Sequence, residues 1–292
     1  MTIETAVPAK INLWLEVTGK RPDGYHDISS LMLPVTVFDR IGIEVEAGEG
    51  PVSLECSEPE IPHDAQNLAW RAADLFREAT GNRSGVRMRL DKAIPSGAGL
   101  GGGSSDAAGV LVSLNEHFGK PLSGGELERL ALRLGADVPF FLYRRPALAT
   151  GVGEKLEFAG EVPGYPLVLI KPPLSVPTAW VYQSLKLTRG GSQITLRNFS
   201  ADPWRLAEFV QNDLEPVTAS RHPVVSDLKR WLLERGAPAA AMSGSGPTVF
   251  GIFGSGGAAH AVAAEARAAW EGFWVCAAEV IGAPDAGMES RP

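Results

Sequence analysis

The sequence predicts an α+β protein made of two domains. Its 292 residues lie in the range of about 250–300 residues at which single hydrophobic cores stop growing. Strand and helix patterns follow one another without the strict alternation of a doubly wound parallel sheet, which favours α+β domains. The pattern changes after Phe141, so we place a loose boundary near residue 150. We expect an N-terminal domain over residues 1–150, a C-terminal domain over residues 151–284 and a disordered tail over residues 285–292.

The composition is that of a soluble globular protein, with 45% hydrophobic and 21% charged residues. A net charge of −7 and the absence of a dense Lys/Arg run argue against a nucleic-acid surface. Cys56 and Cys276 lack metal-ligand spacing and are expected to be reduced thiols. Residues 1–8 do not resemble a secretion signal, and the most apolar stretch, residues 237–253, is interrupted by Ser, Gly and Pro. We therefore expect a cytoplasmic protein without a membrane span.

In the N-terminal half, alternation from Ile11 to Val17 predicts a strand whose polar face carries Lys10 and Asn12. A Pro- and Gly-containing turn at residues 19–24 then returns the chain, so that Tyr25 and His26 lie near the same end. Further strands are expected at residues 31–37, 40–45 and 86–90. One helix is expected from its cap Asn67 to about Thr80, with Gly81 ending it. Another begins at the capping box Ser123–Glu126 and ends at Gly135.

In the C-terminal half, short apolar strands alternate with helical patterns. Thr178 is expected to cap a helical segment over residues 179–185, and residues 186–201 have no clear period and predict a variable connection. A second glycine-serine loop occupies residues 243–247. The other expected elements are strands at residues 167–170, 248–253 and 273–281, and helices at residues 204–211, 224–235 and 258–270.

The stretch with the strongest chemical signal is PSGAGLGGGSSDAA, from Pro95 to Ala108. Its five glycines allow a ligand to approach the backbone and permit positive φ angles. A helical pattern follows, and a helix N-terminus with unpaired amides favours phosphate. The part of the stretch that precedes the helical pattern consists of Pro95, Ser96, Gly97, Ala98, Gly99, Leu100, Gly101, Gly102, Gly103, Ser104 and Ser105.

Three other interpretations of this stretch agree less well with its residues. A plain glycine-rich connector would not need so many glycines, because each costs backbone entropy. A Walker loop requires a lysine before its final Ser or Thr, and none is present. Gly97, Gly99 and Gly102 satisfy the Rossmann pattern G-x-G-x-x-G, but the acidic strand end expected about 20 residues later is missing, since Glu116 lies in a helical pattern.

Two isolated charges are candidates for catalysis. Asp137 stands between Ala and Val, where an unpaired carboxylate is unfavourable, although it could instead cap the turn before Pro139. Lys10 begins an apolar strand, and its alternative role is that of an edge lysine whose head reaches solvent. Beside a phosphate loop, Asp137 could orient or deprotonate an attacking hydroxyl. Lys10 could keep Asp137 ionised, lower the pKa of the hydroxyl or neutralise charge on the phosphoryl group, and the sequence leaves these roles open.

Tyr25 and His26 offer a planar ring and an imidazole near this strand. Such a pair suits stacking on a base and hydrogen bonding to its edge. The alternative is an aromatic turn anchor next to a surface histidine. A metal-ligand role for His26 is disfavoured because no companion His or Cys lies at ligand spacing in the sequence.

Four blocks together resemble the GHMP kinase superfamily: AKINLWLEVTGKRPDGYH, PSGAGLGGGSSDAA, GADVPFF and MSGSGPTVFGIF, which begin at residues 9, 95, 135 and 242. The resemblance implies an N-terminal domain like ribosomal protein S5 domain 2 and a ferredoxin-like C-terminal domain. It also implies ATP with Mg²⁺, phosphate binding by Pro95 to Ser105, and Lys10 and Asp137 as the catalytic pair. Ser105 is the one candidate for a Mg²⁺ ligand.

The first block is similar to the branch of the superfamily that phosphorylates a hydroxyl of a cytidine diphosphate-linked methylerythritol in the non-mevalonate isoprenoid route. This resemblance implies that Asn12 contacts the methylerythritol end, Tyr25 stacks on cytosine, His26 reads the base edge and Thr178 lies near the same substrate. The alternatives kept open are another small-alcohol kinase of the homoserine or mevalonate type, a catalytically silent nucleotide-binding protein and a nicotinamide-dependent oxidoreductase.

Overall fold

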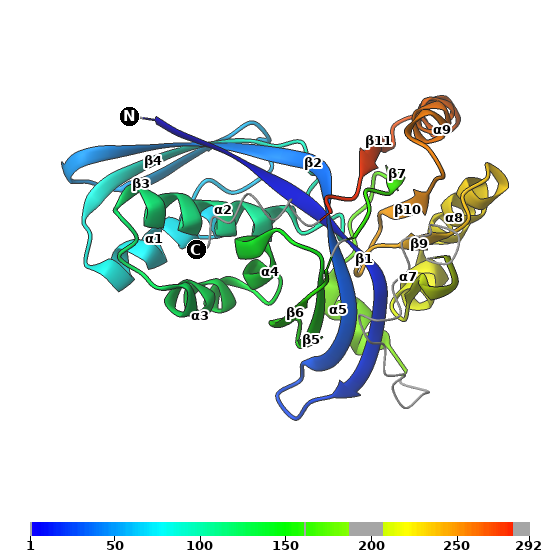
Figure 1. Cartoon of the computed structure of the whole chain (residues 1–292), viewed down its shortest axis with the longest axis horizontal. Helices are drawn as coiled ribbons and strands as arrows, with labels where there is room; N and C mark the ends of the chain where they lie inside the picture. Colours follow the sequence, from blue (N-terminus) through cyan, green and yellow to red (C-terminus); the bar gives the residue numbers. More distant parts are fainter. Residues whose placement is uncertain (1, 161, 187–206, 283–292) are drawn as a thin grey trace.

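The computed structural model describes residues 2–160, 162–186 and 207–282, which form two sheets with helices packed against them (Figure 1). The first sheet has the order β3-β4-β2-β1-β8, and β5 pairs with β2 and β6 with β5. Its strands are β1 (Thr2–Lys20), β2 (His26–Glu49), β3 (Val52–Cys56), β4 (Ser84–Asp91), β5 (Ala147–Gly151), β6 (Lys155–Phe158) and β8 (Gln211–Asn212).

Strands β1 and β2 form a long antiparallel hairpin that spans the molecule (Figure 1). The predicted turn is present but spans residues 21–25, because Gly19 and Lys20 still pair with Asp27 and His26. The break predicted between residues 37 and 40 is wrong, because β2 runs through it and Phe38 and Asp39 stay paired with β1. The pairing register shifts between Pro8 and Ala9, because Pro8 pairs with Phe38 and Ala9 with Val35. The two extra residues of β2 form a bulge there, and one strand continues where two were expected.

Four helices pack beneath the first sheet: α1 (Leu68–Thr80), α2 (Gly102–His117), α3 (Gly124–Leu134) and α4 (Val138–Tyr143) (Figure 1). The predicted start of α1 is confirmed, since the Asn67 side chain accepts a hydrogen bond from the amide of Ala69. Gly81 ends α1 in the left-handed conformation, and α3 begins with the predicted capping box. Apolar side chains of these helices and of the sheet form one buried cluster that holds α2 in place.

The second sheet has the order β11-β7-β10-β9, formed by β7 (Pro166–Lys171), β9 (Ala240–Met242), β10 (Val249–Ile252) and β11 (Trp274–Glu279). Strand β7 pairs antiparallel with both β10 and β11, and the helices α8 (Val224–Glu234) and α9 (Gly256–Ala269) connect the strands. When these four strands are numbered 1–4 along the chain, their order across the sheet is 4-1-3-2, with a β-α-β-β-α-β succession. This confirms the ferredoxin-like C-terminal domain, and with it the two-domain α+β fold.

The remaining segments connect the sheets near their junction. They are α5 (Thr178–Ser184), the 3₁₀ turn η2 (Ala207–Phe209), β8 and α7 (Glu215–Arg221). The helix expected over residues 204–211 is wrong in its described part, because only the short turn η2 is helical and β8 pairs in parallel with Trp14 and Leu15. The Asn212 side-chain amide donates to the carbonyl oxygens of Met242 and Gly244. Tertiary contacts therefore determine the backbone conformation of β8. Residues 187–201, 204–206 and the predicted tail lie outside the described residues.

The division near residue 150 stays a prediction. Strands β5 and β6 belong to the first sheet, which therefore continues to Phe158. A helix long and apolar enough to cross a membrane is not found in the described part of the chain.

Candidate functional site

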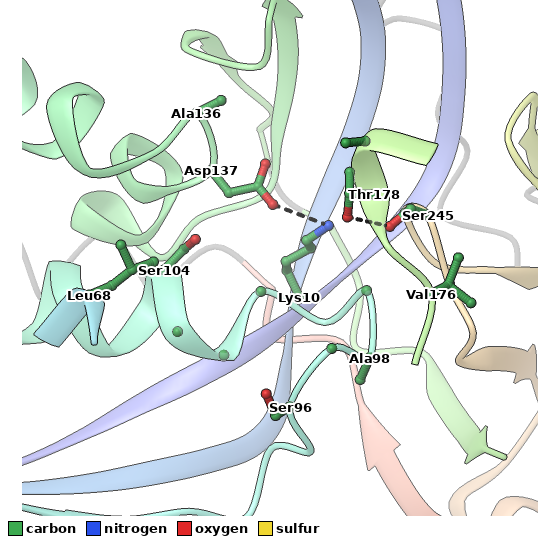
Figure 2. Close-up of a pocket in the computed structure, with 18 of the residues that line it drawn as sticks. Lys10, Leu68, Ser96, Ala98, Ser104, Ala136, Asp137, Val176, Thr178 and Ser245 are labelled. Atoms are coloured by element: carbon green, nitrogen blue, oxygen red, sulfur yellow. Dashed lines mark hydrogen bonds and ion pairs between the residues drawn. The ribbon is translucent and has the colours of Figure 1, made fainter. Parts of the chain in front are cut away.

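A cavity of about 950 Å³ lies where the two sheets meet, and both halves of the chain line it. The N-terminal half contributes β1, the turn before β2, the glycine-rich stretch and residues just before α4. The C-terminal half contributes α5 and the second glycine-serine loop. Figure 2 shows the glycine-rich stretch passing below Lys10, with Asp137 and Thr178 above it.

The glycine-rich stretch forms a tight loop that leads into α2. Gly97, Gly99 and Gly101 have φ values of +60°, +76° and +73°, which side chains rarely adopt. A Cβ atom on Gly99 would lie 2.2 Å from the Ser243 carbonyl oxygen, so the two glycine-containing loops are in backbone contact. Gly101 precedes α2 and offers no side-chain cap, which leaves the first amides of the helix available to an anion.

Most of the predicted phosphate-binding residues line the cavity, but Leu100 and Ser105 do not. The Leu100 side chain is buried in an apolar cluster, and its carbonyl accepts a hydrogen bond from the Lys10 amide at 2.9 Å. The buried Ser105 hydroxyl donates to the Pro8 carbonyl at 2.7 Å. Both residues thus fasten the loop to β1, and the structure does not bring Ser105, the predicted Mg²⁺ ligand, to the cavity.

The two predicted catalytic residues meet in the cavity. Lys10 Nζ lies 3.5 Å from Asp137 Oδ2 (Figure 2), and the side-chain exposures are 4% for Lys10 and 38% for Asp137. A solvent-seeking edge lysine would not be buried to this degree. Asp137 precedes α4, but its side chain makes no capping hydrogen bond. The arrangement therefore places a buried ammonium against a carboxylate that remains open to the cavity.

Strand alternation brings Lys10 and Asn12 to the cavity side of β1, as predicted, and a β-bulge directly follows them. The register of β1 shifts between Asn12 and Trp14, so the successive residues Leu13 and Trp14 both pack into the same apolar cluster. Lys10 and Asn12 point to the other side, where Lys10 Nζ donates to Asn12 Oδ1 at 2.6 Å. Asn12 lines the cavity as predicted, although its side chain is already hydrogen-bonded within the protein.

The aromatic residues form a second region of the cavity. Tyr25 is 64% exposed and His26 is buried, and the His26 ring lies 5.3 Å from the ring of Tyr182 on α5. Burial, together with the nearby charge of Lys20, lowers the pKa of His26 and favours the neutral imidazole. Burial and the negative charge of Asp137 raise the pKa of Tyr182, so its hydroxyl stays protonated. Tyr182 was not among the predicted site residues, because nothing in its local sequence distinguishes it.

Thr178 lines the cavity, but its predicted capping role is wrong. It is the first residue of α5 and Pro177 precedes the helix. The Thr178 hydroxyl is instead 2.8 Å from the hydroxyl of Ser245 in the second glycine-serine loop (Figure 2). Its hydroxyl thus joins α5 to that loop.

Sequence reasoning also missed a buried ion-pair group behind the glycine-rich loop. Lys92 Nζ bonds to Asp39 and lies 2.7 Å from Asp106 Oδ2. Asp39 also accepts hydrogen bonds from the amides of Ala93 and Ile94, so the group ties the entry of the loop to α2. Burial, with the charge of Asp39, raises the pKa of Asp106 to about 7, although Lys92 opposes this shift. The only local signal was Asp106, which stands inside the glycine-rich motif.

Comparisons with known proteins agree with this geometry. The chain matches the families described as GHMP kinases N terminal domain, over residues 67–145, and GHMP kinases C terminal, over residues 196–272. A 4-diphosphocytidyl-2-C-methyl-D-erythritol kinase of Geobacter sp. (strain M21) is 44% identical over 90% of this chain and 94% of its own length. One from Citrifermentans bemidjiense is 43% identical over 96% of this chain and 99% of its own length. The chain belongs to this kinase family.

Solved structures extend the same result. A crystal structure of 4-(cytidine 5'-diphospho)-2C-methyl-D-erythritol kinase superposes with a TM-score of 0.81 at 37% identity, covering 96% of this chain and all of the other. The homoserine kinase of Cytophaga hutchinsonii superposes with a TM-score of 0.74 at 19% identity over 96% of this chain and 95% of its own, a likeness that shows the fold alone. Membership of the kinase family confirms the resemblance found in the sequence and is incompatible with a nicotinamide-dependent oxidoreductase.

Proposed function

We propose that this protein transfers the γ-phosphoryl group of ATP to the 2-hydroxyl of 4-diphosphocytidyl-2-C-methyl-D-erythritol. The observation that carries the proposal is the Lys10–Asp137 pair, 3.5 Å apart beside the glycine-rich loop in a single cavity. Relatives at 43–44% identity that bear the name of this kinase support the choice of substrate.

The glycine-rich loop and the first amides of α2 bind the triphosphate. Backbone amides and the positive end of the helix dipole stabilise an anion without a Lys/Arg cluster, in accord with the net charge of −7. The close contact between Gly99 and the Ser243 carbonyl fixes the loop before the nucleotide arrives. Less ordering is then needed on binding.

Asp137 accepts the proton of the attacking hydroxyl. A bond forms between the hydroxyl oxygen and the γ-phosphorus while the bond from the γ-phosphorus to the bridging oxygen of ADP breaks. The Lys10 ammonium pairs with the Asp137 carboxylate and opposes the negative charge on the transferred group. Catalysis here consists of positioning and charge stabilisation, which a buried ammonium beside an open carboxylate supplies.

The cytidine end of the acceptor binds at the aromatic region. Tyr25 is exposed at the cavity and offers a free ring face for stacking on cytosine. The neutral His26 imidazole has one donor and one acceptor nitrogen for the base edge, and Tyr182 supports its ring. Asn12 and Thr178 line the same cavity and contact the methylerythritol end.

Mg²⁺ fits this cavity as an ion carried by the nucleotide. The residues that the structure describes contain no group of three His, Cys, Asp or Glu side chains suited to a metal. Kinase sites need only one or two carboxylates, because phosphate oxygens and water supply the other ligands of Mg²⁺. Asp106 and Asp137 line the cavity and would hold the ion, and Asp106 Oδ1 is buried without a hydrogen-bond partner. When bound, the ion neutralises phosphate charge.

A substrate panel tests the proposed function. The purified protein is assayed for ADP release with 4-diphosphocytidyl-2-C-methyl-D-erythritol, homoserine and mevalonate, and phosphorus NMR locates the new phosphate. We expect turnover of the first compound and phosphorylation of its 2-hydroxyl. Turnover of homoserine or mevalonate in its place, or ADP release without any phosphorylated acceptor, would refute the proposal.

Two variants test the catalytic pair. Lys10→Met and Asp137→Asn should each lower kcat by at least about 10³-fold, because each removes a charge that the transition state uses. The affinity for ATP should change by less than about threefold, since the glycine-rich loop supplies most of the phosphate contacts. Arg89→Met, which removes an exposed cation from β4, is the control and should leave kcat unchanged. Full activity of either catalytic variant would remove that residue from the mechanism.

A further inference from the structure

Lys10 and Asn12 continue into a buried series of hydrogen bonds whose far members, Ser30 and the Trp14 carbonyl, take no part in the reaction described above. Lys10 Nζ donates to Asn12 Oδ1 at 2.6 Å, and Asn12 Nδ2 donates to the Ser30 hydroxyl at 2.8 Å. The Ser30 hydroxyl donates in turn to the Trp14 carbonyl oxygen at 2.7 Å. Ser30 lies on β2 and is fully buried, so this chain runs from the neighbouring strand to the catalytic ammonium.

The direction of every hydrogen bond in this series follows from its last acceptor, the Trp14 carbonyl oxygen. A carbonyl oxygen only accepts, so the single proton of the Ser30 hydroxyl goes to Trp14. The hydroxyl must then accept a hydrogen bond from Asn12, which turns the amide NH₂ group toward Ser30. The amide oxygen consequently faces Lys10, whose ammonium has only donors. The opposite amide orientation would set two donors against each other.

Ser243, from the other half of the chain, fixes the backbone of Asn12 in a similar way. The buried Ser243 hydroxyl donates to the Gly99 carbonyl at 3.0 Å and accepts a hydrogen bond from the Asn12 amide at 3.2 Å. Two serines from different elements therefore hold Asn12, one through its side chain and one through its backbone. The glycine-rich loop and the strand that carries Lys10 are linked through one of them.

We propose that Ser30 is a positioning residue for phosphoryl transfer, which acts through the Asn12 amide to hold the Lys10 ammonium. This inference rests on the proposed function for the role of Lys10. The ammonium has three N–H groups. Asn12 takes one at 2.6 Å and Asp137 faces a second at 3.5 Å, which leaves the third for an oxygen of the transferred group.

Kinetics of a double-mutant cycle test the inference. Ser30→Ala leaves the Asn12 amide without its acceptor, so kcat should fall at least about tenfold while KM for ATP and for the acceptor changes less than about threefold. In an Asn12→Ala background, adding Ser30→Ala should change kcat less than about twofold, because the route to Lys10 is already broken. Equal losses in both backgrounds would show a merely structural role and overturn the inference.

Two further variants complete the design. Ser29→Ala removes a neighbouring buried serine hydroxyl from the same strand, and its kcat should stay within about twofold of the unmodified protein. Ser30→Cys keeps the shape of the side chain with a weaker acceptor and should give an intermediate kcat, which keeps the test available if Ser30→Ala folds poorly. A Ser30→Cys variant with unchanged kcat would count against the inference.

A crystal structure of Ser30→Ala supplies a readout that does not depend on the acceptor. We expect the Lys10 ammonium to leave Asn12 Oδ1, or the Asn12 amide to turn. Retention of the 2.6 Å contact in that variant would overturn the inference even if the kinase reaction is confirmed. Conversely, an unmodified protein that fails to phosphorylate the cytidyl substrate refutes the proposed function, and the displacement of Lys10 still decides the role of Ser30.

Discussion

Replacing Gly99 by alanine should separate the two glycine-containing loops. The residue has a φ of +76°, and a Cβ atom there would lie 2.2 Å from the Ser243 carbonyl oxygen and 3.1 Å from the Gly246 amide nitrogen. These are backbone atoms, so no side-chain rotation relieves the overlap. The left-handed conformation alone costs about 1–2 kcal/mol for a residue with a Cβ atom. With the broken loop contact, we expect a total loss of about 2–4 kcal/mol of the free energy of unfolding.

Gly103 provides the matched control from the same motif. It lies within α2, and a Cβ atom there would meet only the Leu68 side chain, at 3.7 Å. Gly103→Ala should therefore leave the stability unchanged or raise it by up to about 1 kcal/mol, since alanine favours a helix. Urea unfolding and titration with an ATP analogue measure both variants, and Gly99→Ala should also bind the nucleotide at least about tenfold more weakly. Equal stability and equal nucleotide affinity for the two variants would refute the reasoning.

Three further predictions concern single side chains. Burial raises the pKa of Asp106 to about 7, so the folded protein keeps a proton that the unfolded chain releases near pH 4. The free energy of unfolding should therefore fall as the pH rises from about 4 to about 7. Asp106→Asn should flatten that part of the pH profile in urea unfolding, and an unchanged slope would contradict it. Lys92→Met leaves Asp39 and Asp106 as buried carboxylates without their cation and should cost about 3–5 kcal/mol in the same assay; a loss below about 1 kcal/mol would speak against the ion-pair group. Tyr25→Ala should raise KM for the cytidyl substrate about 5- to 150-fold, the worth of about 1–3 kcal/mol of base stacking, with stability within about 0.5 kcal/mol; an unchanged KM would exclude stacking.

Local chemistry made much of this fold predictable. The ends of α1 follow from Asn67 and Gly81, and the start of α3 follows from the capping box, because these signals act over three or four residues. Lys10 and Asp137 could be selected because each places a charge in an apolar setting. The sequence suggested that they need partners, and the fold supplies each with the other.

Features that depend on distant parts of the chain could not be predicted in this way. The bulge between Asn12 and Trp14 reverses the side-chain alternation of β1 and is set by pairing with β2. The two residues of β8, Gln211 and Asn212, pair with β1 because of contacts across the two halves, whereas the local pattern placed Gln211 at the end of a helix. Lys92 lies at the end of a strand where a solvent-exposed lysine is ordinary, and only its position against Asp39 reveals its burial.

The junction of the two sheets has a consequence for the whole molecule. Strand β8, from the C-terminal half, forms the edge of the first sheet beside β1. In one apolar cluster, Leu33 of β2 packs with Leu169 and Phe250 of the second sheet. A fragment cut near residue 150 would expose an unpaired strand edge and half of that cluster. We therefore expect each half to be less stable alone than in the whole chain, and a split form of this protein to be most stable when both pieces are present together.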